Sequence, residues 1–139
     1  PLVRGHYDLL LQVLANLIGN ALKFTRAGGK VALRVYQLRS QQDLYRATPP
    51  HVRVEICDTG IGIGSEDQQA IFDRFFRVEN LVHTLEGTGL GLSIVRNILE
   101  EKHHSKVFLV SEVGVGTTFW FDLEVFEETL NSEELGVRS

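Results

Sequence analysis

Apolar residues recur every three to four positions through the first part of the chain. Between residues 7 and 24, YDLLLQVLANLIGNALKF, they cover most of a helical surface, which predicts an amphipathic helix over this range. The next segment, TRAGGK, supplies the glycines at which such a helix stops. The sequence therefore predicts that the chain begins with one long, core-forming helix.

Other segments alternate between apolar and polar residues, which is the pattern of a half-buried strand. Residues 30–38, KVALRVYQL, alternate well, and residues 52–58, VRVEICD, alternate strictly. The polar stretch 39–51 between them ends near Pro-Pro and is predicted to be a surface connection. Near the end of the chain, residues 106–113 and 117–125 flank a Gly-Val-Gly turn, which predicts an antiparallel hairpin.

The middle of the chain is predicted to hold two helices. A glycine-rich turn, DTGIGIGSED, leads into a short amphipathic helix over residues 67–78, and a longer helix is predicted over residues 90–103. Residues 79–89 between them are predicted to be flexible. The resulting order of elements does not alternate as a doubly wound parallel fold requires. It favours an α+β fold, a two-layer α/β sandwich with a mixed, mostly antiparallel sheet and helices on one face.

Length and charge indicate one domain of a longer protein. The 139 residues are 43% hydrophobic, which is enough to build a single core. Residues 124–139 carry five glutamates and one arginine, so they account for the net charge of −4. We expect residues 1–126 to form the domain and residues 127–139 a disordered acidic tail. The chain contains no methionine, which suggests a domain excised from something longer.

Composition also argues against several classes of function. No basic run or stripe is present, so a nucleic-acid surface is not expected. No apolar stretch approaches the roughly 20 residues that a membrane span needs. The single cysteine, Cys57, cannot form an internal disulfide and fits a reducing compartment. These features predict a cytoplasmic domain and leave open whether the full-length protein is anchored to a membrane.

One stripe of the first helix is polar. Asn16, Asn20 and Lys23 are spaced i, i+4 and i+7, which places them on one side of an otherwise apolar helix. A solvated helix edge would explain this stripe, and so would a ligand site.

Asp58 ends the strictly alternating strand on the face shared by Val52, Val54 and Ile56. A carboxylate directed toward the helix layer needs a partner, because an unpaired buried charge is costly. Either an adenine amino group or a backbone N–H of the following glycine turn would serve.

Glycines gather in three clusters. The cluster Gly87, Gly89 and Gly91 stands at the start of a predicted helix, so its N–H groups would form an anion site of the kind that holds phosphates. Neither G-x-G-x-x-G nor G-x-x-x-x-G-K-[ST] is present, so a nucleotide would be bound in another way. The clusters are Gly60, Gly62 and Gly64; Gly87, Gly89 and Gly91; Gly114 and Gly116.

Together these segments resemble the catalytic and ATP-binding domain of sensor histidine kinases. NLIGNALK is similar to the N box of that family, DTGIGI to the G1 box, IFDRFFR to the F box, GTGLGLSI to the G2 box and GVGTTF to the G3 box. The five motifs stand in the family's order and cover nearly the whole chain. The resemblance implies the Bergerat ATP-binding fold shared with gyrase, Hsp90 and MutL, and the use of ATP and Mg²⁺. The wording of the motifs is similar to that of cyanobacterial or plastid sensor kinases.

The resemblance implies roles at the phosphate end of the nucleotide. Asn20 would ligate Mg²⁺, since an amide oxygen suits a hard cation. Lys23 and Arg77 would meet the phosphates. In gyrase-like ATPases the position of Asn16 is a glutamate that activates water, whereas an amide cannot take that proton. The catalytic set Asn16, Asn20, Lys23 and Arg77 therefore favours phosphoryl transfer to an imidazole over hydrolysis.

The resemblance implies further contacts to the nucleotide. Asp58 would accept a hydrogen bond from the adenine N6 amino group, and Thr117 would assist through water. The other implied nucleotide contacts surround the base or belong to the G2 box: Phe24, Gly60, Gly62, Ile63, Gly87, Thr88, Gly89, Leu90, Gly91 and Leu92.

The phosphoacceptor imidazole is not expected in this chain. None of the five histidines stands in an H-E-L-x-x-P-like context, so each is predicted to be a surface residue. The resemblance implies dimerisation and phosphoacceptor helices before Pro1, a monomeric isolated domain, a homodimeric full-length protein and a cognate response regulator. Three rivals remain open: a gyrase- or Hsp90-like ATPase, an anti-sigma-type serine kinase, and a degenerate module that binds nucleotide only to change shape.

Two further expectations concern the segment before the G2 box. Phe72 and Phe75 are predicted to anchor its short helix in the core rather than to touch ATP. Residues 78–86 are predicted to be the ATP lid and the most mobile interior segment without nucleotide.

Overall fold

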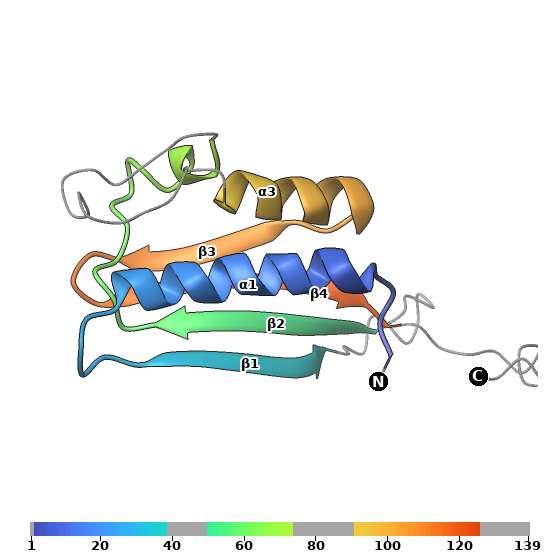
Figure 1. Ribbon diagram of the computed structural model, residues 1–139, viewed down its shortest axis with the longest axis horizontal. Coiled ribbons are helices and arrows are strands. Elements are labelled where there is room, and N and C mark those ends of the chain that lie inside the picture. Colours follow the sequence, from blue (N-terminus) through green and yellow to red (C-terminus); the bar gives the residue numbers. More distant parts are fainter. Residues whose placement is uncertain (1, 39–49, 74–90, 126–139) are drawn as a thin grey trace, which may run out of the picture.

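A four-stranded sheet with helices packed on one face forms the part of the chain that the structure describes (Figure 1). The computed structural model describes residues 2–38, 50–73 and 91–125. The strands stand in the order β1-β2-β4-β3. The elements are, in chain order, α1 (Tyr7–Phe24), β1 (Val31–Leu38), β2 (His51–Asp58), the 3-10 helix η1 (Ala70–Phe72), α3 (Gly91–Asn97), the π-helix η2 (Ile98–Lys102), β3 (Val107–Glu112) and β4 (Gly116–Glu124).

This arrangement confirms the predicted α+β fold with helices on one face. The sequence predicts a mixed, mostly antiparallel sheet, and all the pairings among the described strands are antiparallel. The hairpin predicted around the Gly-Val-Gly turn is confirmed as β3 with β4, the strands predicted at 30–38 and 52–58 pair as β1 with β2, and the two pairs join through an antiparallel β2–β4 contact. The strict alternation of β2 is explained by this central place, because its even positions are buried under the helices.

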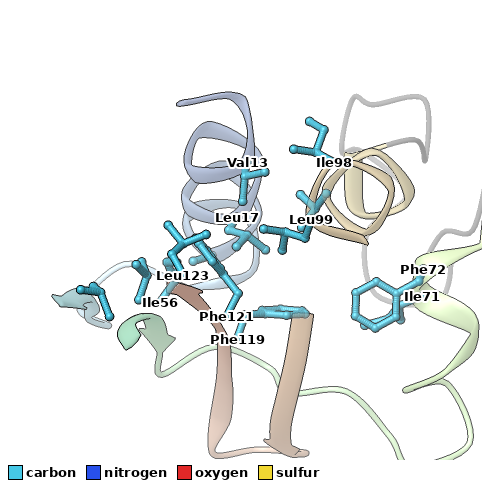
Figure 2. Close-up of a cluster of buried hydrophobic side chains, with 14 of the residues drawn as sticks. Val13, Leu17, Ile56, Ile71, Phe72, Ile98, Leu99, Phe119, Phe121 and Leu123 are labelled. Carbon is cyan, nitrogen blue, oxygen red and sulfur yellow. The ribbon is translucent and has the colours of Figure 1, made fainter. Parts of the chain in front are cut away.

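The core lies between the sheet and the helix layer, where α1 and α3 run side by side (Figure 2). Leu17 of α1, Leu99 of η2 and Phe121 of β4 are almost fully buried and point into this layer. Phe72 of η1 is buried as predicted and meets the ring of Phe119 edge to face, with 6.3 Å between the ring centroids. The Arg96 guanidinium lies over the Phe72 ring, 5.9 Å from its centroid.

The predicted bounds of α1 are confirmed. Asp8 in the first turn and Lys23 in the last turn both suit the helix dipole. The chain becomes extended at Thr25, whose hydroxyl donates to the carbonyl of Ala21 at 2.7 Å and so pairs one C-terminal acceptor. The turn into β1 then uses Gly28 with φ of 90°, a conformation that favours glycine.

Two other predicted helices differ from the structure. The helix expected over 67–78 is only the single 3-10 turn η1 within the described residues, because Asp73 is already extended with ψ of 150°. The helix expected over 90–103 begins at Gly91 as α3 and ends in the π turn η2. One π turn barely alters an apolar pattern, so the sequence could not distinguish it from a continued α-helix.

His103 is not the surface residue that the sequence predicts. Its ring is half-buried, with Nδ1 3.1 Å from the carbonyl oxygen of Ile98 and Nε2 accepting from the backbone N–H of His6 at 2.9 Å. Because Nε2 accepts from His6, the hydrogen-bond donor of the ring is Nδ1, which donates to the carbonyl of Ile98. His103 thus ties the end of η2 to the N-cap of α1.

The other face of the sheet carries Trp120, which packs against a residue of the neighbouring strand β3. Its ring stacks on Phe108 with 5.4 Å between centroids, and the Arg53 guanidinium lies 5.6 Å from the Trp120 ring centroid. Arg53 donates two hydrogen bonds to Asp122 at 2.8 and 3.0 Å, and this pairing raises the pKa of Arg53. Cys57 lies half-buried on the same face.

The two ends of the described chain meet. Val3 forms an antiparallel bridge with Val125, and the N–H of Arg4 donates to the carbonyl of Glu124 at 2.9 Å. Within the described ranges, we find no helix with the length and apolarity needed to cross a bilayer. The predictions for the lid 78–86 with Phe75, for the tail 127–139 and for most of the connection 39–51 lie outside the described residues. The connection ends earlier than predicted, because Pro50 is buried and His51 begins β2.

We expect Leu17→Ala to lower the free energy of unfolding by about 2–5 kcal/mol, since it leaves a cavity in the core. Leu17 is fully buried, whereas Leu22 on the same helix is 61% exposed. Leu22→Ala is the matched control and should change stability by less than about 1 kcal/mol. Equal losses in urea denaturation would show that the helix layer is packed differently.

Candidate functional site

Asp58 at the end of β2 is held by two backbone N–H groups. Its Oδ1 accepts from Gly60 at 2.8 Å and from Thr117 of β4 at 3.2 Å. Asp58 and Thr117 are also cross-strand partners, so their side chains share the helix-facing side of the sheet. The predicted phase of Asp58 is confirmed, and the glycine turn does supply a partner. The other carboxylate oxygen of Asp58, Oδ2, has no hydrogen-bond partner within residues 2–38, 50–73 and 91–125.

The glycine turn after β2 is packed between α1 and the β3–β4 hairpin. A methyl group added at Gly60 would lie 2.4 Å from the carbonyl oxygen of Phe24, and one added at Gly62 would lie 2.2 Å from that of Glu112. Gly62 also has φ of 78°, which favours glycine. The N–H of Ile61 donates to the Phe24 carbonyl at 3.2 Å. The close approach explains why this turn needs glycine at both positions.

Two polar residues in this region were missed by sequence reasoning. Ser111 of β3 accepts from the N–H of Ile63 at 2.8 Å and lies 2.7 Å from the hydroxyl of Thr117. The Gln68 amide donates to the Ile63 carbonyl at 2.9 Å. The sequence did indicate Ser111 as a candidate, because it is a polar residue at a position of β3 whose side chain faces the helices. Its hydrogen-bond partners, however, cannot be read from the sequence.

The polar stripe of α1 faces the start of α3. Asn16 and Asn20 are half-buried, and neither side-chain amide has a hydrogen-bond partner in the described part of the chain. A methyl group added at Gly91 would lie 3.5 Å from Oδ1 of Asn16, so the N-terminal end of α3 lies against this stripe. Lys23 is exposed in the last turn of α1. The structure thus brings Asn16 beside Gly91, the last glycine of the G2 motif.

Several of the predicted site residues lie outside the described residues. These are Arg77, Gly87, Thr88, Gly89 and Leu90, so their placement relative to the stripe stays a prediction. Gly91 and Leu92 are half-buried at the start of α3.

The residues present fit an adenine nucleotide with a divalent cation. The half-buried amide oxygens of Asn16 and Asn20, which have no hydrogen-bond partner among the described residues, are ligands that Mg²⁺ accepts alongside phosphate oxygens and water. At the other end of the site, Asp58 and Thr117 present oxygen atoms beside the tightly packed glycine turn. Oxygen acceptors at that position suit a ligand with an amino group.

Comparison with known proteins identifies the family. The sequence profile of the histidine kinase-, DNA gyrase B-, and HSP90-like ATPases matches residues 5–127. The chain belongs to this family.

Individual relatives narrow the class further. Drug sensory protein A of Synechocystis sp. is 65% identical over 130 residues, which are 94% of this chain and 20% of that protein. The uncharacterized sensor-like histidine kinase ycf26 of Pyropia yezoensis is 54% identical over 132 residues, 93% of this chain and 20% of that protein. The solved structure of the mycobacterial sensor histidine kinase MprB is 28% identical with a TM-score of 0.70, covering 88% of this chain and 74% of that one.

These likenesses confirm the resemblance to the histidine-kinase type of ATP-binding domain, including its cyanobacterial or plastid character. The chain spans about a fifth of the length of the two curated relatives.

Proposed function

We propose that the chain is the catalytic domain of a two-component sensor histidine kinase, binding Mg²⁺-ATP and donating its γ-phosphoryl group to a histidine on separate helices. The observation that carries the proposal is the fixed carboxylate of Asp58, with Oδ1 held by two N–H groups and Oδ2 without a described partner. Such a carboxylate offers an acceptor to the exocyclic amino group of adenine. Membership of the family and the kinase relatives support the reaction class.

Adenine would lie against the glycine turn. Gly60 and Gly62 let the turn pack closely against α1 and the β3–β4 hairpin, and Ile63 and Phe24 are half-buried beside it. Thr117 would add a second oxygen next to Asp58, directly or through water. The base end of the site is thus built from β2, β4 and the turn after β2.

The phosphates would lie along the polar stripe of α1. Asn20 would hold the cation and Lys23 would meet the phosphate chain, with Arg77 and the G2 glycines completing the site as proposed from the sequence. When bound, Mg²⁺ neutralises phosphate charge and orients the chain of phosphates. The protein's own part is positioning and charge neutralisation, which suffice for phosphoryl transfer.

Transfer to an imidazole is favoured over hydrolysis. The imidazole nitrogen attacks the γ-phosphorus, the bond to the bridging oxygen breaks, and ADP leaves with that electron pair. Asn16 of α1 lies beside the start of α3, where the phosphates would bind, and its amide cannot take a proton from water. Water attack is therefore not promoted at this position.

Asn16→Glu is expected to raise Mg²⁺-dependent ATP hydrolysis by the chain about tenfold or more, because a carboxylate can act as a general base. Asn16→Gln is the matched control, since it has the same length without a base, and it should leave hydrolysis at the wild-type rate. Phosphate release at saturating ATP measures the hydrolysis rates of the three chains. A wild-type chain that hydrolyses ATP as fast as Asn16→Glu would favour the gyrase- or Hsp90-like alternative.

The proposal extends to the whole protein. Dimerisation and phosphoacceptor helices would precede residues 1–126, the full-length protein would be a homodimer, and a response regulator would receive the phosphoryl group. The domain would face the cytoplasm, with no nucleic acid as partner. The isolated domain would be a monomer.

The experiment that tests the reaction class is autophosphorylation of the full-length protein with γ-labelled ATP. The proposal expects a phosphoryl group that acid removes and base does not, because a phosphorus–nitrogen bond to histidine behaves in this way. An acid-stable label would indicate a serine kinase instead. Nucleotide binding without any label, in the presence of Mg²⁺, would indicate a degenerate binding module.

A further inference from the structure

We propose that Ser111 is a positioning residue that makes the site select adenine over guanine, by fixing the Thr117 hydroxyl as a hydrogen-bond acceptor. The inference rests on the proposed binding of an adenine nucleotide at Asp58. Ser111 would touch no ligand and would act through Thr117.

The hydroxyl of Ser111 has three partners. It accepts from the N–H of Ile63 at 2.8 Å, donates to the carbonyl of Gly116 at 3.1 Å, and lies 2.7 Å from Oγ1 of Thr117. A hydroxyl has one hydrogen and two acceptor positions. All three contacts are satisfied together only if the hydrogen of Ser111 goes to Gly116 and the hydrogen of Thr117 goes to Ser111.

This assignment decides what Thr117 can offer a ligand. Thr117 is buried, and as the cross-strand partner of Asp58 it lies beside that carboxylate. With its hydrogen engaged by Ser111, its oxygen presents only lone pairs. The base end then carries two acceptors, Oδ2 of Asp58 and Oγ1 of Thr117. Adenine presents an amino group there, whereas guanine presents a carbonyl oxygen that would meet acceptors only.

The same hydroxyl also joins two chain segments that form the base end. Ile63 belongs to the glycine turn after β2, and Gly116 begins β4. A separate bond, from the N–H of Gly114 to the carbonyl of Ile61 at 2.9 Å, holds the same two segments together. The segments would therefore stay in contact without the Ser111 hydroxyl, so a substitution should change the freedom of Thr117 rather than the fold.

The test compares ATP and GTP binding by Ser111→Ala, Ser111→Thr and the matched control Ser105→Ala. Ser105 also donates to a β4 carbonyl, that of Asp122 at 2.7 Å, but away from Asp58. We expect Ser111→Ala to reduce the preference for ATP over GTP about 3- to 10-fold, the value of one hydrogen bond. Ser111→Thr keeps a hydroxyl and Ser105→Ala leaves the site alone, so both should retain the wild-type preference.

A double-mutant cycle separates positioning from a merely structural role. Once Thr117→Val has removed the hydroxyl that Ser111 orients, adding Ser111→Ala should leave the ATP-to-GTP ratio unchanged. A Ser111→Ala chain that loses its fold, or that keeps its fold and the wild-type ratio, would overturn the assignment. If the wild-type chain binds neither nucleotide, both the proposed function and the role of Ser111 fail. If the wild type prefers ATP and Ser111→Ala prefers it to the same extent, only the role of Ser111 fails.

Discussion

Asp58→Asn is expected to lower the affinity of the chain for ATP about 10- to 100-fold, because the new amide puts a donor against the adenine amino donor. The substitution should be mild for the fold. The amide oxygen can replace Oδ1 and still accept from the N–H groups of Gly60 and Thr117, which hold the carboxylate now. The side-chain NH₂ then stands at the place of Oδ2, where the base would bind.

Guanine nucleotides provide the control for this substitution. Guanine has a carbonyl oxygen where adenine has its amino group, so the NH₂ of the asparagine would find an acceptor. GTP affinity should stay the same or rise while ATP affinity falls, and thermal unfolding should be near that of the wild type. Parallel losses for ATP and GTP in calorimetric titrations would mean that Asp58 supports the turn and does not read the base.

Asn20→Ala is expected to weaken the binding of Mg²⁺-ATP at least about tenfold, since even removing a group behind a metal ligand costs about 10- to 100-fold. Asn20 is half-buried and its amide has no hydrogen-bond partner in the ranges that the structure describes. Its loss should therefore cost little stability. Binding of ATP in the presence of a chelator should change little, because the amide acts through the cation.

Asn97→Ala is the matched control for Asn20→Ala. Asn97 is exposed at the end of α3, and its side chain makes no capping hydrogen bond. It should bind ATP as the wild type does, with and without Mg²⁺. If Asn20→Ala loses the same affinity in the chelator as in Mg²⁺, the amide contacts the nucleotide itself and the role assigned to it is wrong.

The spacing of apolar and polar residues predicted the bounds of α1 and the side of the sheet that Asp58 faces. The bounds of α1 follow from its apolar repeat and from the stop at Thr25, and both structure and sequence agree on Tyr7–Phe24. The inward phase of Asp58 follows from alternation in β2, because successive side chains point to opposite faces. These features need no knowledge of the rest of the fold.

Contacts between distant segments could not be predicted in the same way. The bond from Ile63 to Ser111 joins residues 48 positions apart, and the bond from Thr117 to Asp58 joins residues 59 apart. Both depend on how β4 and β3 align beside β2, which is set by packing of the whole sheet. The sequence showed a serine in the inward phase of β3 but not the three groups that surround it.

The bridge made by His103 is another contact between distant segments that the sequence did not predict. Its histidine ring lies between the end of η2 and the backbone of His6, 97 residues away. Sequence position suggested a solvent-exposed helix end. The ring is held there because two backbone groups, one donor and one acceptor, match its two nitrogens.

The most direct test of the central claim is equilibrium binding of ATP and GTP to the wild-type chain, each measured by calorimetric titration with Mg²⁺ and with a chelator. We expect ATP to bind at least about tenfold tighter than GTP, because guanine leaves the acceptors of Asp58 and Thr117 without a donor. We also expect chelation to weaken ATP binding. Equal affinity for ATP and GTP, or no binding of ATP in Mg²⁺, would show that Asp58 and Thr117 do not read an adenine base.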